Sequence, residues 1–271
     1  MLTLLCFLLA GLLLPLFPLS IGINLLLQHA GDGPLSKPLA QAALMLLMPL
    51  VGVGLIALGL ALAKTNGGAS ALMTPFALWG GATSVFYAFR MLSARDGRIW
   101  LAQLYTSALA LIWVGIAHEV PPLLPALGLA LPLLPLLFLF DSLARRFGIA
   151  RVGLYPGLGL RMPHFSTLFV IAVLVAVAVP FSPGFFAIAD LAFGGVGRNE
   201  LVTLLPLGIS WLLWTWAGIN LLTGIVFGIP RDDLRYRDLK PAAAVAQSVG
   251  MLALAIFGVF LVERALSTTP P

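Results

Sequence analysis

The chain has 271 residues, of which 61% are hydrophobic and only 9% are charged, against about 25% in an ordinary soluble domain. This composition excludes a water-soluble globule and predicts an all-α polytopic membrane protein. The single cysteine, Cys6, and three scattered histidines provide no set of metal ligands, so we expect no metal and no redox cofactor.

Eight apolar segments are long enough to cross a hydrocarbon core of about 30 Å as helices. In chain order they are residues 2–27, 39–63, 72–91, 99–117, 122–140, 163–193, 201–228 and 241–262. The first segment has no basic residue before its apolar run, which is atypical of a cleaved signal peptide, so we expect it to remain in the mature chain.

The basic residues fall into two unequal groups in alternate loops. Of the 15 lysines and arginines, only Lys64, Arg198 and Arg264 lie on one side of the predicted membrane. The positive-inside rule therefore predicts that the other loops, including those around Arg95 and Arg235, are cytoplasmic. Both termini are then expected outside, in a bacterial-type inner (cytoplasmic) membrane. The net charge of +5 favours anionic lipids at the cytoplasmic face as partners, and does not argue for nucleic acid.

The segment 163–193 is too long for one straight crossing. Pro180 and Pro183 each remove a backbone donor, and Gly184 permits local unwinding, so we predict a long helix that is broken near these residues. Such breaks recur at transport sites, although a simple structural kink is the alternative. Asp190 is the acidic residue inside this span, and it is the candidate for proton exchange within the membrane.

The seventh segment carries polar residues, among them Asn220, close to three tryptophans, Trp211, Trp214 and Trp216. These side chains could line a hydrated groove on an ion or proton path. Aromatic packing and interhelical hydrogen bonds explain the same pattern equally well, so both interpretations stay open.

Several short motifs follow one another from Leu72 to the end of the chain. They are Asp96-x-Arg98-x3-Ala102, LLFLFDSL at 136–143, GLGLRMP at 157–163, Pro180 with Gly184, Phe185, Phe186 and Ala187, and VFG at 226–228. In order and spacing they resemble the C-terminal half of the antiporter-like membrane subunits of respiratory complex I, Mrp-type antiporters, group 4 hydrogenases and inorganic-carbon pumps. Residues 67–271 would then be an antiporter-like half with six helices, whereas residues 1–66, with two helices, show no clear match.

The resemblance implies that ions move along a central row of buried Lys, His and Glu in such subunits. The corresponding positions here are Ala130, Leu134 and Ile188, which are all apolar. We therefore expect a non-catalytic membrane subunit that packs or couples inside a larger ion- or proton-translocating complex, with other integral membrane subunits as partners. The alternative is an active half-channel that contributes directly to proton or cation transport.

Overall fold

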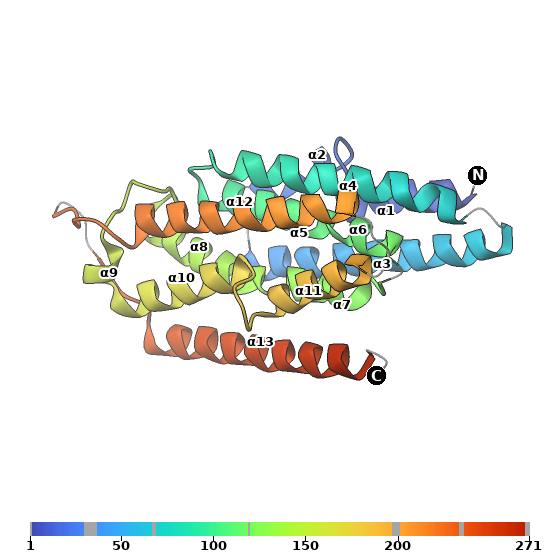
Figure 1. The fold of residues 1–271 in the computed structure, drawn as a ribbon. Helices are drawn as coiled ribbons and strands as arrows, with labels where there is room; N and C mark the ends of the chain where they lie inside the picture. Colours follow the sequence, from blue (N-terminus) through green and yellow to red (C-terminus); the bar gives the residue numbers. More distant parts are fainter. Residues whose placement is uncertain are drawn as a thin grey trace.

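The computed structural model describes residues 2–29, 37–66, 69–118, 120–196, 201–232 and 236–268. Within these ranges the chain forms a bundle of helices and contains no β-strand (Figure 1). The helices are α1 (Leu2–Leu13), α2 (Ile21–His29), α3 (Pro38–Asn66), α4 (Ala69–Met91), α5 (Gly97–Ala110), α6 (Ile112–Ala117), α7 (Leu123–Ala130), α8 (Leu133–Phe147), α9 (Leu158–Arg161), α10 (Pro163–Ala176), α11 (Pro183–Val196), α12 (Leu201–Ile225) and α13 (Pro241–Thr268).

Five segments of the described chain are long and apolar enough to cross a membrane. They are Pro38–Leu62, Gly97–Ala117, Leu123–Phe147, Leu204–Ile225 and Pro241–Leu261. Shorter apolar helices accompany them at Leu2–Leu13, Pro163–Ala176 and Pro183–Gly194. The predicted all-α, multi-pass membrane protein is therefore confirmed.

The predicted break within 163–193 is confirmed, because α10 ends at Ala176 and α11 begins at Pro183. The prediction of one continuous helix over 2–27 was wrong, since α1 ends at Leu13 and α2 begins at Ile21. Pro15 and Pro18 lie in this interruption, where neither can donate a backbone hydrogen bond.

Two further segments that were predicted as single helices are also interrupted. Residues 99–117 divide into α5 and α6 at Leu111, and residues 122–140 divide into α7 and α8 at Leu131 and Pro132. Helix α8 also continues to Phe147, beyond the predicted end at 140. Pro132 cannot donate to the helix ladder, which accounts for the second interruption.

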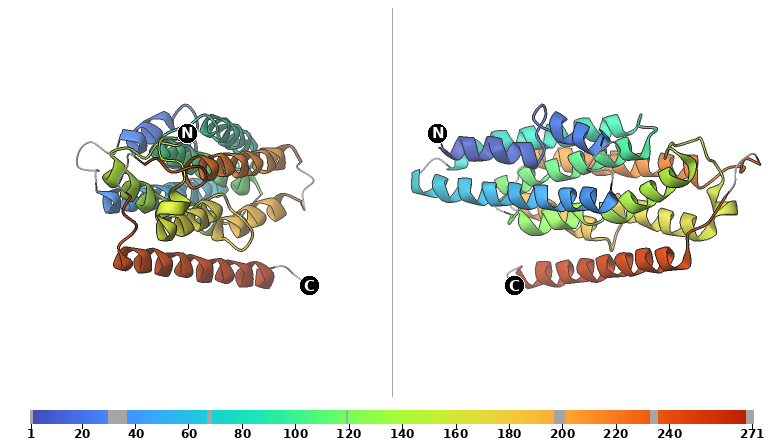
Figure 2. Two further views of the ribbon diagram at one scale, coloured as in Figure 1. Left: turned by 90° about the vertical axis from the view of Figure 1, so that its left-hand side faces the viewer. Right: turned by 180° about the vertical axis from the view of Figure 1, so that it is seen from behind.

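The α5–α6 segment forms the centre of the bundle. The most apolar stretch of this segment is 94% buried inside the protein, whereas the corresponding stretch of α13 is only 17% buried. Helix α4 packs against α5, α6 and α12, α1 packs against α3, and α11 packs against α7 and α13. Figure 2 shows α13 lying along one side of the bundle, consistent with its low burial.

Both chain ends lie towards the same end of the bundle, at the right of Figure 1, whereas α9 and the start of α13 lie at the opposite end. The predicted topology used Arg198 and Arg235, which lie outside the described residues. Residue 67, where the antiporter-like half was predicted to begin, also lies outside them.

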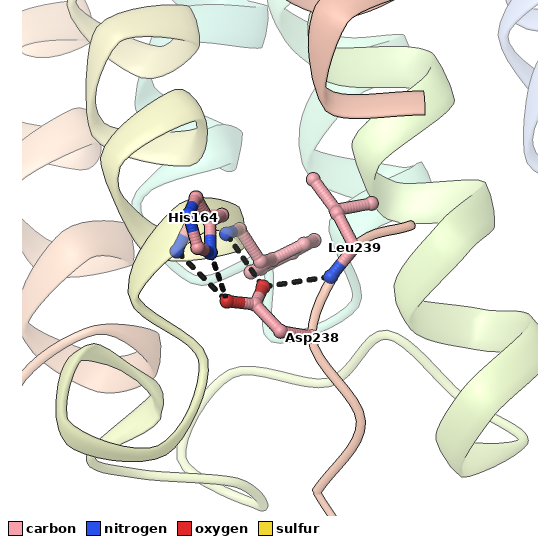
Figure 3. A network of polar contacts seen from close by, with 4 residues as sticks. His164, Asp238 and Leu239 are labelled. Atoms are coloured by element: carbon pink, nitrogen blue, oxygen red, sulfur yellow. Dashed lines mark hydrogen bonds and ion pairs between the residues drawn. The ribbon is translucent and has the colours of Figure 1, made fainter. Parts of the chain in front are cut away.

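The loop before α13 is fastened to the first turn of α10 through Asp238 (Figure 3). Its carboxylate accepts hydrogen bonds from the backbone N–H groups of His164 (2.9 Å), Phe165 (2.9 Å) and Leu239 (2.7 Å), and lies 2.8 Å from His164 Nδ1. Burial alone raises the pKa of Asp238, but the hydrogen bonds to its charged form outweigh this effect and hold the pKa below its ordinary value.

Candidate functional site

The break between α10 and α11 contains strained backbone. Ala178 and Phe181 have φ angles of 59° and 71°, in the left-handed region that side chains other than glycine rarely adopt. Ser182 then caps α11, because its Oγ accepts a hydrogen bond from Phe185 N–H at 3.2 Å, and Pro183 opens the helix. Pro183 and Gly184 are buried, whereas Pro180 is exposed at the same break.

Three other helices cover this break. The Ala178 carbonyl accepts a hydrogen bond from the Trp211 indole of α12 at 3.2 Å. A Cβ on Gly258 of α13 would lie 3.3 Å from the Phe181 carbonyl oxygen, and one on Gly128 of α7 would lie 3.0 Å from that of Pro183. Helices α7, α12 and α13 of the same chain therefore lie against this irregular backbone.

The break between α1 and α2 is covered in a similar way. The Trp113 indole donates to the Leu14 carbonyl at 3.0 Å, and the Trp79 indole donates to the Phe17 carbonyl. The Phe17 N–H in turn donates to Thr83 Oγ1 at 3.0 Å. Thus both broken helices have backbone carbonyls that are hydrogen-bonded by tryptophan side chains from elsewhere in the chain.

A hydroxyl network lies inside the bundle where α4, α5 and α12 meet. Ser84 Oγ donates to Ser210 Oγ at 2.8 Å and lies 3.1 Å from Ser107 Oγ. Ser107 Oγ donates to the Ser84 carbonyl and accepts from the Trp214 indole, each at 2.8 Å. All four side chains are buried, so these hydrogen bonds satisfy groups that cannot reach water.

A second polar contact joins α2 to α5. Asn24 donates from Nδ2 to Thr106 Oγ1 at 2.9 Å and to the Ala102 carbonyl at 3.2 Å. Gln28 donates in turn to the Asn24 side-chain oxygen.

Among the residues whose burial the structure describes, the buried polar side chains include no Asp, Glu, Lys or Arg. They are Ser20, Asn24, Gln41, Thr83, Ser84, Gln103, Thr106, Ser107, His118, Ser166, Ser182 and Ser210. The described interior is thus a set of hydroxyl, amide and imidazole groups rather than a row of interacting charges.

Of the three positions that the resemblance equates with a titratable row, Ala130 and Ile188 lie on the contacting helices α7 and α11, and Leu134 lies on α8. Ala130 is fully buried at the end of α7, Ile188 is 4% exposed on α11, and Leu134 is half-buried on α8. A Cβ on Gly128 would lie only 2.9 Å from the Cβ of Ala187, so the two helices meet closely there. This contact therefore places apolar side chains where the resemblance implies charged ones.

The structure separates the remaining predicted residues from one another. Asp190 is half-buried on α11, seven residues or about 10 Å along the helix from Pro183. No hydrogen bond or ion pair joins Asp190 to another residue in the described part of the chain. Asn220 is exposed on α12, on a different face from the buried Ser210 and Trp214, and it does not lie with the helix break.

The sequence did not indicate the contacts between tryptophans and the breaks. These contacts join residues 33 to 99 positions apart, so no local pattern could reveal them. The Trp, Ser and Thr residues of the seventh segment form one cluster in the sequence, but in the structure they divide between a buried and an exposed face of α12.

No protein-family model matches the sequence. An uncharacterized protein of Aquifex aeolicus (strain VF5) is 24% identical over 157 residues, which are 58% of this chain and 64% of that protein.

Solved structures of three membrane complexes contain chains with the same fold. Respiratory complex I from Thermus thermophilus matches with a TM-score of 0.79 and 20% identity, over 95% of this chain and 54% of that chain. The Mrp complex from Dietzia sp. DQ12-45-1b matches at 0.78 and 19%, over 96% and 57%. The archaeal membrane-bound sulfane sulfur reductase matches at 0.80 and 18%, over 95% and 53%.

These matches establish the fold of antiporter-like membrane subunits, as the sequence motifs predicted. The chain spans about half the length of the solved chains. Because the matches cover 95% or more of this chain, the similarity in fold extends over most of residues 1–66, for which the sequence showed no resemblance.

Proposed function

We propose that this protein is a non-catalytic membrane subunit of a larger ion- or proton-translocating complex, in which it packs between or couples other membrane subunits. Its fold supports this proposal, since the three matched chains belong to multi-subunit membrane complexes. We further propose a bacterial-type cytoplasmic membrane, with both termini on the outer side and the basic loops inside.

The observation that carries the proposal is the absence of carboxylate, ammonium and guanidinium groups among the buried side chains that the structure describes. Proton transfer through a membrane protein needs titratable groups or water at successive positions along a path. Here the described buried polar side chains include no carboxylate, ammonium or guanidinium group. At both helix breaks, tryptophan indoles donate hydrogen bonds to backbone carbonyl oxygens. An interior of this kind suits a packing role better than conduction.

One observation favours the alternative of an active half-channel. Asp190 is half-buried within the apolar helix α11 and has no partner among the described residues. A carboxylate in such a place is expensive in hydrocarbon and is usually functional. If this chain contributes a proton step, Asp190 is the residue that would carry it.

Substitutions made within the intact complex distinguish the packing role from the active half-channel. The complex is purified from its native membrane through a tag on this chain, reconstituted in liposomes, and assayed for coupled proton movement with a pH-sensitive dye. Asp190→Asn keeps the size of the side chain and removes its charge, and Asp232→Asn, in the exposed loop after α12, is the matched control.

Under the packing role, both variants assemble and both retain coupled transport. Loss of transport by the assembled Asp190→Asn complex, with Asp232→Asn active, would establish the half-channel instead. The chain reconstituted alone is expected to conduct no protons.

A further inference from the structure

Two sequence motifs that the proposed function leaves unused meet at one end of the bundle, at α9 (Figure 1). The loop segment 157–163, which includes the short helix α9, carries GLGLRMP, and VFG at 226–228 follows α12. Gly157 N–H donates to the Phe227 carbonyl and Gly159 N–H donates to the Val226 carbonyl, each at 3.0 Å. The two loops are therefore joined backbone to backbone.

Glycine is required for this approach. Gly157 has a φ of 76°, and a Cβ there would lie 2.6 Å from the backbone nitrogen of Pro230. Residue 228 is also a glycine with positive φ, at 113°. The sequence thus uses glycines to bring two loops together, which fixes the side chains that follow them.

The joined loops expose three large apolar side chains, which we call the apolar ridge: Leu160 is 75% exposed, Phe227 60% and Ile229 87%. Their neighbours Leu158 and Met162 are fully buried, so the loop that carries Leu160 is anchored on both sides of it. The ridge is consequently a fixed feature of the surface.

The length of α12 places the ridge at the edge of the hydrocarbon. The apolar window Leu204–Ile225 has 22 residues, and at about 1.5 Å per residue it spans the whole hydrocarbon core of about 30 Å. Phe227 and Ile229 lie two and four residues after this window, and Leu160 lies three residues before the start of α10. All three therefore lie at the level of the lipid headgroups.

Cationic side chains stand beside the ridge. Arg161 follows Leu160, and Arg231 lies two residues after Ile229. Arg161 pairs with Asp232 at 3.2 Å, but the Asp232 side chain is 92% exposed, so water and salt screen this pair strongly. A phosphate group can replace Asp232 as the partner of the guanidinium.

We propose that the apolar ridge inserts into the headgroup layer of the membrane and that Arg161 binds the phosphate of an anionic phospholipid there. Apolar side chains flanked by arginines are the composition of segments that lie in the membrane interface. Besides the membrane-spanning helices themselves, the ridge is thus a further contact with the bilayer. It holds the cytoplasmic ends of α10 and α12 at a fixed depth. It does not depend on whether the chain conducts protons.

Spin-label accessibility tests the insertion. Labels are attached to Leu160→Cys, Phe227→Cys and Ile229→Cys, and to Asp232→Cys as the control, and the proteins are studied in native membranes and in phosphatidylcholine nanodiscs with phosphatidylglycerol. The parent protein is the labelling blank, because its single cysteine, Cys6, is buried. We expect the three ridge labels to collide several-fold more often with oxygen than with an aqueous nickel chelate, and the label at 232 to show the reverse.

Ridge labels as accessible to nickel as the label at 232 would show that the ridge faces water and would overturn the proposal. Low accessibility to both reagents in native membranes, with oxygen access in nanodiscs, would show that a protein partner covers the ridge and would overturn it equally.

The phosphate contact is tested with the label at 229. Arg161→Gln should lower the ratio of oxygen to nickel collisions in nanodiscs that contain phosphatidylglycerol, whereas Arg145→Gln, on α8, should leave it unchanged. A ratio that is the same with and without phosphatidylglycerol, in the parent and in Arg161→Gln, would refute the role of the anionic headgroup.

Discussion

Trp211 provides the clearest test of a single hydrogen bond at a helix break. Its indole donates to the carbonyl of Ala178, which has left the α-helical ladder. Trp211→Phe keeps most of the ring and removes the donor, so we expect a loss of about 1–3 kcal/mol of stability. Trp216→Phe is the control, because Trp216 is 62% exposed and its loss should cost about 0.5 kcal/mol or less. Thermal unfolding in detergent measures both; equal stability of the two variants would contradict this role.

Asp238 makes the attachment of the α13 loop dependent on pH. Its pKa lies below the ordinary value in the folded protein, so its contribution to stability is present above the unfolded pKa and is lost as the pH falls through the folded pKa. We expect Asp238→Asn to cost about 1 kcal/mol at neutral pH, as loss of a helix N-terminal acceptor does, and to remove this acid dependence.

Hydrogen exchange at the amides of His164 and Phe165 reports the change directly, since both donate to Asp238. Exposed Asp232 is the matched control, and Asp232→Asn should leave those rates as they are. Unchanged exchange in Asp238→Asn would argue that the loop is held by other contacts.

At the scale of the helix, α13 carries two glycines in different surroundings. A Cβ on Gly258 would meet the backbone of Phe181 and Pro183 at 3.3–3.4 Å, whereas one on Gly250 would meet nothing within 4 Å. Gly258→Leu should therefore force α13 away from the helix break, and Gly250→Leu should be tolerated. Protease sensitivity of α13 in detergent distinguishes them. If both variants resist alike, α13 does not depend on this close approach.

The sequence predicted one helix break and missed another for the same physical reason. A span that is apolar on all sides has no amphipathic period, so proline and excess length are the available local signals. The segment 163–193 shows both signals, whereas 2–27 has the length of one ordinary crossing, so that Pro15 and Pro18 are the signals of its interruption. The interruption at Pro132 was missed in the same way.

At the scale of the whole molecule, the distribution of basic residues predicts the orientation. Reporter fusions placed after Gly148 and after Thr268 should be active on opposite sides, the first in the cytoplasm and the second outside. A cytoplasmic C-terminus would mean that the number of crossings is odd.

The sequence predicts the fold more completely than it predicts the candidate site. The membrane class, the predicted break at Pro180–Gly184 and the antiporter-like fold follow from composition and ordered motifs. The hydroxyl network does not, because Ser84, Ser107 and Ser210 come from three helices and nothing local distinguishes them from other small polar residues that support packing. The position of Asn220 on an exposed face likewise depends on how α12 is rotated within the bundle.

The neutral interior has an electrical consequence. A membrane potential of 100 mV does about 2.3 kcal/mol of work on each elementary charge that crosses it, so a protein senses voltage through charges that move within its membrane-spanning part. The buried side chains of the described residues carry no carboxylate, ammonium or guanidinium group. Displacement of those side chains would move no carboxylate, ammonium or guanidinium charge, so a voltage dependence carried by the described part of this chain would involve a partly buried charge such as that of Asp190 on α11.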